Sequence, residues 1–194
     1  QRATQLGMAV KLLGLARLTE QGLECRVHPC LVPADAFLAK VEGATNAVSV
    51  TGDPVGTQVY LGEGAGAGPT ASSVISDLID LATVRRIPAF GVAATMLREV
   101  QRLSMEDHLG EYYLRVMVRH APRALASVAA ALGDHGVSVE TLDQSGDSVD
   151  GVKPMRFTTV PGTRESAMQD ALRTIRTLPC VAGELCLIRI ERGV

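Results

Sequence analysis

Four glycines alternate with other residues in the stretch GEGAGAGPTASSVISDLIDLA, which runs from Gly62 to Ala82. The pattern turns helical directly after the glycines, and glycine-rich turns that open a helix often bind phosphate. Gly62, Gly64 and Ala67 also fit the dinucleotide pattern G-x-G-x-x-A. A dinucleotide-binding unit needs a second parallel strand soon after its helix, and no such pattern follows here. The pattern alone therefore favours a flexible turn between a strand and a helix over a phosphate-binding loop.

Two other residue types invite a catalytic role. The chain has only three lysines, Lys11, Lys40 and Lys153, and Lys11 lies inside an apolar run. An amine in that position can act as an acid or base, or its stem can pack while the ammonium group reaches water, which is the favoured interpretation. His28 has no visible nucleophile or acid partner, so a structural role is favoured for it as well.

The four cysteines, Cys25, Cys30, Cys180 and Cys186, form no C-x-x-C pair. Cys25 and Cys30 are an odd number of residues apart, so on one strand they face opposite sides and cannot share a metal ion. The favoured interpretation is four ordinary buried thiols in a reducing cytoplasm. No metal site is expected.

Composition excludes several classes of protein. The chain has 194 residues, of which 46% are hydrophobic, and its formal net charge is -2. This fits a globular protein with a real core and makes a nucleic-acid backbone an unexpected partner. No apolar run approaches the roughly 20 residues that span a bilayer, so no membrane partner is expected.

The first part of the chain predicts four strands and a helix. Two extended runs, 8–19 and 23–32, flank the short loop EQG and predict a hairpin. Two more strands are predicted at 45–53 and 57–64, and a helix at 69–84 with Pro69 in its first turn. These strands are expected to pair into one sheet.

The second part of the chain predicts strands that alternate with helices. Strands are predicted at 111–119, 137–144, 150–160 and 180–191, with helices at 122–136 and 163–178. Thr163 is the expected N-cap of the last helix, and Arg164 and Glu165 mark a solvated helix start. The order β-α-β-β-α-β is that of the ferredoxin-like fold. The segment 86–110 is predicted to be a linker with one short helix, and the fold class is α+β.

Two stretches carry a resemblance to a known family. The blocks LGMAVKLLGLARLTEQGLECRVHPCLVPADAFLAKVEGATNAVSVTGDPVG and YLGEGAGAGPTASSVISDLIDLA resemble the catalytic domain of homoserine dehydrogenase, in the right order and without a large gap. Residues 111–191 resemble an ACT regulatory domain. The resemblance implies three parts: residues 1–85, the C-terminal part of a catalytic domain with a mixed sheet; residues 86–110, a linker; and residues 111–194, an ACT domain.

The resemblance also implies an activity. The family interconverts L-homoserine and L-aspartate 4-semialdehyde with NADP or NAD, in threonine and methionine biosynthesis, as a cytoplasmic homodimer. Gly66 falls where the family has a cofactor-contacting glycine. The dinucleotide fingerprint and the catalytic lysine are expected upstream of Gln1, so Lys11 is not the catalytic lysine and no catalytic residue is assigned. The chain alone is expected to be inactive.

The turn before the first ACT helix departs from the family pattern. The usual Asp-x-Pro-Gly is replaced by His120-Ala121-Pro122-Arg123. Arg119, His120 and Arg123 are candidates to bind the carboxylate of an amino-acid effector, with threonine expected from the family. The alternative is a domain that only mediates assembly. A different overall interpretation is a stand-alone ACT-type amino-acid sensor whose N-terminal segment only dimerises, but such a sensor needs no glycine loop.

Overall fold

The computed structural model describes residues 2–83, 90–119, 121–146 and 148–194. Their helices and strands are α1 (Arg2–Gln5), β1 (Met8–Thr19), β2 (Gly22–Pro33), β3 (Thr45–Gly52), β4 (Gly56–Glu63), α2 (Ala67–Ala82), β5 (Leu109–Arg119), α3 (Ala124–Asp134), β6 (Val139–Asp143), β7 (Val152–Thr159), β8 (Thr163–Arg164), α4 (Glu165–Arg176) and β9 (Cys186–Ile190). The longer helices and strands follow the order predicted from the sequence, and the short elements α1 and β8 are additional. No described helix is long and apolar enough to cross a membrane.

The chain divides into two compact units. One holds the residues up to Ala34 together with Gln101–Gly193, and the other holds Asp35–Val100. The predicted hairpin therefore groups with the C-terminal residues. The expectation that all strands of the first 84 residues share one sheet is wrong, because β1 and β2 belong to the larger sheet while β3 and β4 form a two-stranded sheet. Sequence patterns identify strands, but they carry no information on a partner strand more than 150 residues away.

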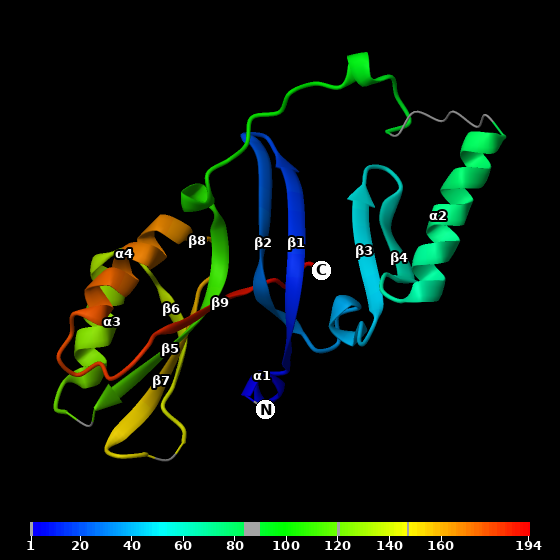
Figure 1. Cartoon of the computed structure of the whole chain (residues 1–194). Helices are drawn as coiled ribbons and strands as arrows, with labels where there is room; N and C mark the ends of the chain where they lie inside the picture. The colour runs from blue at the N-terminus through cyan, green and yellow to red at the C-terminus, as the bar shows by residue number, and fades with distance from the viewer. Residues whose placement is uncertain (1, 84–89, 120, 147) are drawn as a thin grey trace. The chain divides into compact units, whose positions relative to one another are not determined.

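The larger unit is built on a mixed sheet with the strand order β1-β2-β9-β5-β7-β6. β2 and β9 are parallel, with Cys30 opposite Arg189 and Leu31 opposite Ile190, whereas the other neighbours are antiparallel. The segment from β5 to β9 has the predicted β-α-β-β-α-β order, and Figure 1 shows α3 and α4 together on one face of its strands. This is the ferredoxin-like arrangement, and the α+β class is confirmed.

The main hydrophobic core lies between these two helices and the sheet. Alternate residues of β5 point into it, as expected for a strand with one buried face. The fully buried side chains of the core include Tyr112, Leu114, Val116, Val128, Leu132, Met168 and Ile175. The core thus fixes β5 between β7 and β9, and β9 in turn positions the hairpin.

The β1–β2 hairpin is confirmed, and Gly22 shows how its turn is fixed. Gly22 has φ +146°, and a Cβ atom there would lie 2.5 Å from the carbonyl oxygen of Gln101. The neighbouring amide of Leu23 donates to that oxygen at 2.8 Å, and the amide of Leu103 donates back to the oxygen of Leu23 at 2.9 Å. Only glycine permits this close approach of the segment that leads into β5.

The smaller unit contains the β3–β4 hairpin and α2, as predicted. α2 begins at Ala67, two residues before the predicted start, and Pro69 lies in its first turn. No residue of α2 is buried in the described structure, and its apolar residues Val74, Leu78 and Leu81 are each more than half exposed. A large apolar face of this helix is therefore exposed in the described part of the chain.

Two details of the C-terminal part differ from the predictions. Thr163 is not the N-cap of α4, because it lies in β8, pairs with Gly110, and donates its hydroxyl to Val160. The cap position is held by Arg164, whose side chain makes no capping hydrogen bond. The last strand is also shorter than predicted, since Gly183 has φ +90° and interrupts it before Cys186. Of the predicted linker, 86–110, residues 86–89 lie outside the described structure, while short 3-10 helices occupy Ala94–Met96 and Met105–Asp107.

Candidate functional sites

The glycine loop connects β4 to α2, and Gly66 is its N-cap residue. Gly66 has φ 129° and ψ 152°, a combination that is essentially restricted to glycine. Its carbonyl accepts the first helical hydrogen bond, from the amide of Thr70 at 3.1 Å. A Cβ at Gly66 would lie 3.3 Å from Cδ of Pro69, which is tighter than ordinary contact. The backbone conformation of Gly66 thus sets the direction in which α2 leaves the loop.

The start of α2 has the properties of an anion-binding helix end. Its first turn contains no acidic residue that would neutralise the positive end of the helix dipole. A Cβ atom placed on Gly68 would meet no atom within 4 Å, so space is open above the first-turn backbone. These features fit a nucleotide phosphate or a carboxamide, and the contact of Gly66 with a cofactor stays a prediction.

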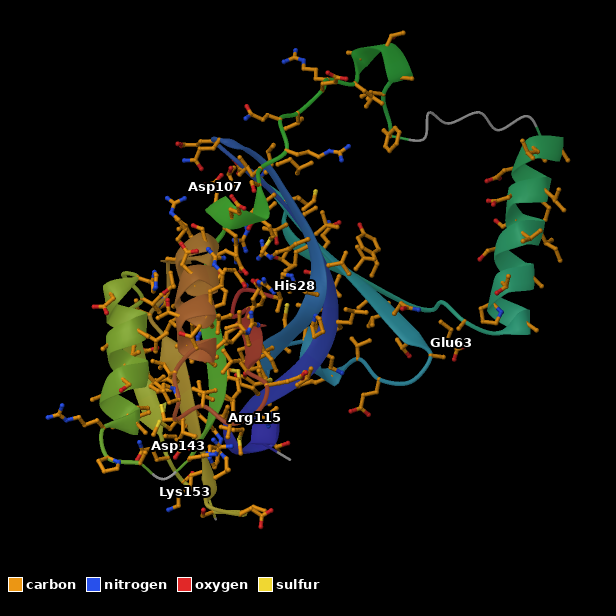
Figure 2. All side chains as sticks on the ribbon, turned by 60° about the vertical axis from the view of Figure 1, so that its left-hand side comes forward. His28, Glu63, Asp107, Arg115, Asp143 and Lys153 are labelled. Carbon is orange, nitrogen blue, oxygen red and sulfur yellow. The ribbon has the colours of Figure 1, made fainter. Side chains whose placement is uncertain are left out.

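A cavity of about 520 Å³ lies at the β5–α3 turn of the larger unit. Arg119 and Arg123, the two predicted effector-binding residues, both line it. The lining also includes the cation Lys153 and the amide of Gln144, which the sequence analysis did not assign. Figure 2 labels Lys153, which lies on β7, and Asp143, which lies on the neighbouring strand β6. The remaining lining is apolar: Val118, Ala121, Ala124, Leu125, Ala126, Pro154 and Met155. Among the described residues that line the cavity, three are cations and none is a carboxylate, and with the apolar floor this suits a small molecule with an anionic group.

Arg123 stands at the N-cap of α3 in the left-handed conformation, with φ 68° and ψ 5°. That conformation costs a residue with a side chain about 1–2 kcal/mol, which explains why the related pattern has glycine there. His120, the third predicted carboxylate ligand, lies outside the described residues.

A buried polar network occupies the sheet face next to the main core. Arg26 is 7% exposed, forms ion pairs with Glu24 and Glu191, and donates to Oε1 of Glu191 at 2.6 Å. His108 also pairs with Glu24 through Nδ1. Burial alone would raise the pKa of Glu24, but Arg26 and His108 outweigh it and hold that pKa below its usual value. The sequence analysis did not predict this network, because its members lie on β2, directly after β9 and directly after a short 3-10 helix, which are far apart in the chain.

Glu165 is the centre of a second group of buried polar side chains. The prediction that Glu165 marks a solvated helix start is wrong. Glu165 is only 4% exposed. It accepts two hydrogen bonds from Arg189, at 2.8 and 2.5 Å, one from the hydroxyl of Tyr112 at 2.9 Å and one from Gln169 at 2.7 Å. Burial opposes its charge, yet these bonds keep the pKa of Glu165 lowered. Arg164 does lie in solvent, where it pairs with Asp107 at 2.9 Å.

Of the remaining residues with reactive side chains, Lys11, His28 and two of the four cysteines lie on the β1–β2 hairpin. His28 is on β2 and Lys11 is on β1, where it stands opposite Cys30. The four cysteines are free thiols, but they are not all buried: Cys25 is exposed, while Cys30 is fully buried. Burial raises the pKa of the Cys30 thiol to about 11. No hydrogen-bonded triad of nucleophile, base and acid is found among these residues within the described structure.

The environment of His108 predicts a pH-dependent stability. Burial, reinforced by Arg26, lowers the pKa of His108 although Glu24 and Glu191 oppose the shift. Between the lowered pKa of the folded state and about pH 6.5, the unfolded chain binds more proton at this residue than the folded chain does. The free energy of unfolding should therefore decrease as the pH is lowered through this range, by up to about 1.4 kcal/mol per pH unit. Urea unfolding at pH 7.5 and 5.5 measures this, and His108→Gln should reduce the difference. An equal difference in variant and unmodified protein would contradict the assignment.

Comparison with known proteins extends over nearly the whole chain. A family model described as homoserine dehydrogenase matches residues 1–79. The chain is 39% identical to the homoserine dehydrogenase of Pseudomonas aeruginosa and 38% identical to that of Neisseria gonorrhoeae; these alignments cover 98% and 97% of the chain and 45% of each relative. The crystal structure of a homoserine dehydrogenase from Thiobacillus denitrificans superposes with a TM-score of 0.85 at 38% identity, over 98% of this chain and 44% of that one. The chain thus spans about 45% of the length of the curated relatives it matches.

Proposed function

The chain belongs to the homoserine dehydrogenase family, and on that premise we propose that it is the part of an NAD(P)-dependent oxidoreductase that interconverts L-homoserine and L-aspartate 4-semialdehyde. One observation supports the proposal. The alignment with the Pseudomonas aeruginosa enzyme covers 98% of the chain and therefore includes both structural units. That coverage does not favour the alternative of a stand-alone amino-acid sensor. The pathway would be that of threonine and methionine.

The glycine loop supplies this chain's contribution to cofactor binding. A bound nicotinamide cofactor would provide the hydride acceptor or donor. Gly66 would let the backbone approach it closely, because a Cβ is absent and the first turn of α2 is uncovered. The loop fits that role in shape and in charge. No residue of this chain is assigned as an acid or base, and Lys11 remains a scaffold residue on β1.

Residues 111–194 would form an ACT-type regulatory domain, residues 1–85 would complete the catalytic domain, and residues 86–110 would link the two. The β-α-β-β-α-β order from β5 to β9 and the cationic cavity at the β5–α3 turn support the ACT-type part of this proposal. The effector would be an amino acid, and threonine is the family's candidate. Its carboxylate would pair with Arg119 and Arg123, and its short side chain would face the apolar floor. Because β5 and β7 line the cavity and β5 pairs with β9, a bound effector would act on the sheet that contains the hairpin.

Arg123→Gly tests the effector site without damaging the fold. Glycine adopts the left-handed conformation freely, so we expect the variant to be as stable as the unmodified protein or more stable. Millimolar threonine should raise the melting temperature of the unmodified protein, because it binds only the folded state. The variant should lose that rise. Threonine that shifts both proteins equally would exclude Arg123, and no shift in the unmodified protein would favour a domain that only mediates assembly.

The protein would act as a homodimer in the cytoplasm. Exposed apolar side chains on β3 and β4, among them Val48, Tyr60 and Leu61, support a second copy as the covering surface. The four free thiols support a reducing compartment. Sedimentation of the native protein at micromolar concentration should show a dimer, and a strict monomer would contradict this part of the proposal.

The activity itself is tested by comparing two proteins. One is the native protein, purified with everything its gene encodes, and the other is residues 1–194 produced alone. We expect the native protein to oxidise NAD(P)H when L-aspartate 4-semialdehyde is added, and the 194 residues alone to be inactive. Absence of turnover in the native protein would reject the proposed function. Equal turnover in both would show that the 194 residues bind the cofactor unaided.

A further inference from the structure

We propose that His28, Cys30 and Glu191 form a binding site for a divalent cation of the zinc class. His28 and Cys30 are two residues apart on β2 and therefore lie on the same face of the sheet. Glu191 directly follows β9, and its amide donates to the carbonyl of Leu31 at 2.9 Å. The parallel pairing of β2 with β9 thus brings the three side chains together from opposite ends of the chain.

The donor set and its spacing match zinc chemistry. An imidazole nitrogen, a thiolate and a carboxylate oxygen are the three protein donors that zinc uses. One ligand atom from each residue lies within 4.8 Å of the others. Zinc bonds of about 2.0–2.3 Å place tetrahedral donors about 3.5 Å apart, so the site would close by roughly 1 Å on binding. Water would fill the fourth position.

His28 provides an independent observation. Its Nε2 atom is buried and has no hydrogen-bond partner within the described structure. Buried polar atoms are nearly always paired, so an orphaned one needs an explanation. Cys30, which is fully buried, makes only a long contact of 3.5 Å from its sulfur to the carbonyl of His28. A cation between the two would accept the lone pair of Nε2 and bind the sulfur.

The surrounding charges permit a cation despite two nearby arginines. Arg26 is paired with Glu24 and Glu191, and Arg189 is paired with Glu165. With Lys11, which stands opposite Cys30 on β1, three carboxylates balance three cationic side chains, and the ionised thiol adds one negative charge. When the metal binds, the Cys30 thiol loses its proton to solvent and the sulfur bonds to the metal. Because Arg26 engages Oε1 of Glu191, the other oxygen of that carboxylate is the donor we assign to the metal.

Titration of the metal-free native protein with Co²⁺ tests the site. Cobalt replaces zinc in such sites and gives a thiolate charge-transfer absorption in the near ultraviolet. We expect this band to saturate at one ion per chain and to disappear on addition of Zn²⁺ but not Mg²⁺. Cys30→Ser should abolish the band, while His28→Ala should weaken binding at least tenfold.

Cys25→Ser is the matched control, because Cys25 lies on the same strand but is exposed. It should leave the band and the affinity unchanged. A band that survives Cys30→Ser, or that is lost in Cys25→Ser, would overturn the assignment. Absence of the band in the unmodified protein would overturn it as well, and dehydrogenase activity in the same preparation would show that the proposed function is unaffected. Circular dichroism of each variant confirms that the fold is retained.

Discussion

Glu165→Ala is expected to lower the free energy of unfolding of the larger unit by about 3 kcal/mol, which is more than a hundredfold in the equilibrium constant. The reason is that Arg189 and the hydroxyl of Tyr112 would be left in a buried site without their common acceptor. Removing one partner of a buried charged pair costs more than the pair contributes. Glu165→Gln, which keeps the shape and part of the hydrogen bonding, should cost less.

Tyrosine signals make the measurement specific. The chain has no tryptophan and three tyrosines, and two of these, Tyr112 and Tyr113, are buried in the larger unit. Urea unfolding followed by near-ultraviolet circular dichroism therefore reports mainly on that unit. Asp107→Ala is the control, since it removes an exposed ion pair with Arg164 and should cost at most about 1 kcal/mol. Similar losses in both variants would show that Glu165 is not the centre of the network.

Gly66→Ala is expected to raise the KM for NAD(P)H of the native enzyme at least tenfold. The conformation of Gly66, φ 129° and ψ 152°, costs a residue with a side chain about 1–3 kcal/mol. The loop would relieve that cost by moving the first turn of α2, and about 1.4 kcal/mol corresponds to a tenfold change in affinity. The kcat should change much less, because Gly66 is proposed to position the cofactor and takes no part in proton transfer.

Gly62→Ala provides the matched control for this experiment. Gly62 lies in β4 of the same loop region, has ordinary backbone angles, and a Cβ there would meet no atom within 4 Å. Its KM for NAD(P)H should stay within about twofold of the unmodified enzyme, since nothing in the loop must move. Equal KM values in Gly66→Ala and the unmodified enzyme would remove Gly66 from the cofactor site.

Local structure was predictable from the sequence wherever a local pattern determines it. The β1–β2 hairpin follows from two extended runs around a short turn, and α2 follows from Pro69 and an apolar stripe. The β-α-β-β-α-β order follows from alternating periodicities that end at glycines. Each of these signals lies within one element or between elements that are neighbours in the sequence. The structure reproduces all of them within a few residues.

The candidate sites were predictable only in part, because they depend on contacts between distant segments. Arg119 and Arg123 flank one turn, so their shared cavity follows from the sequence. Lys153 reaches the same cavity from β7, which pairs with β5, and no local pattern shows that. Glu165 looks like an exposed residue at a helix start until β9 places Arg189 beside it. A single signal was available: charged residues such as Arg26 and Arg189 inside otherwise apolar strands need partners.

The placement of β9 has a consequence for how the chain folds. Its five residues, Cys186–Ile190, lie between β2 and β5 and pair with both strands. During synthesis, β1–β2 and β5–β7 can each form early from nearby residues. The edges of β2 and β5 that will pair with β9 then stay open. Such edges attract other chains, and pairings between distant segments form slowly. Both edges are closed together when β9 pairs, so these five residues determine how long the two edges stay open to other chains.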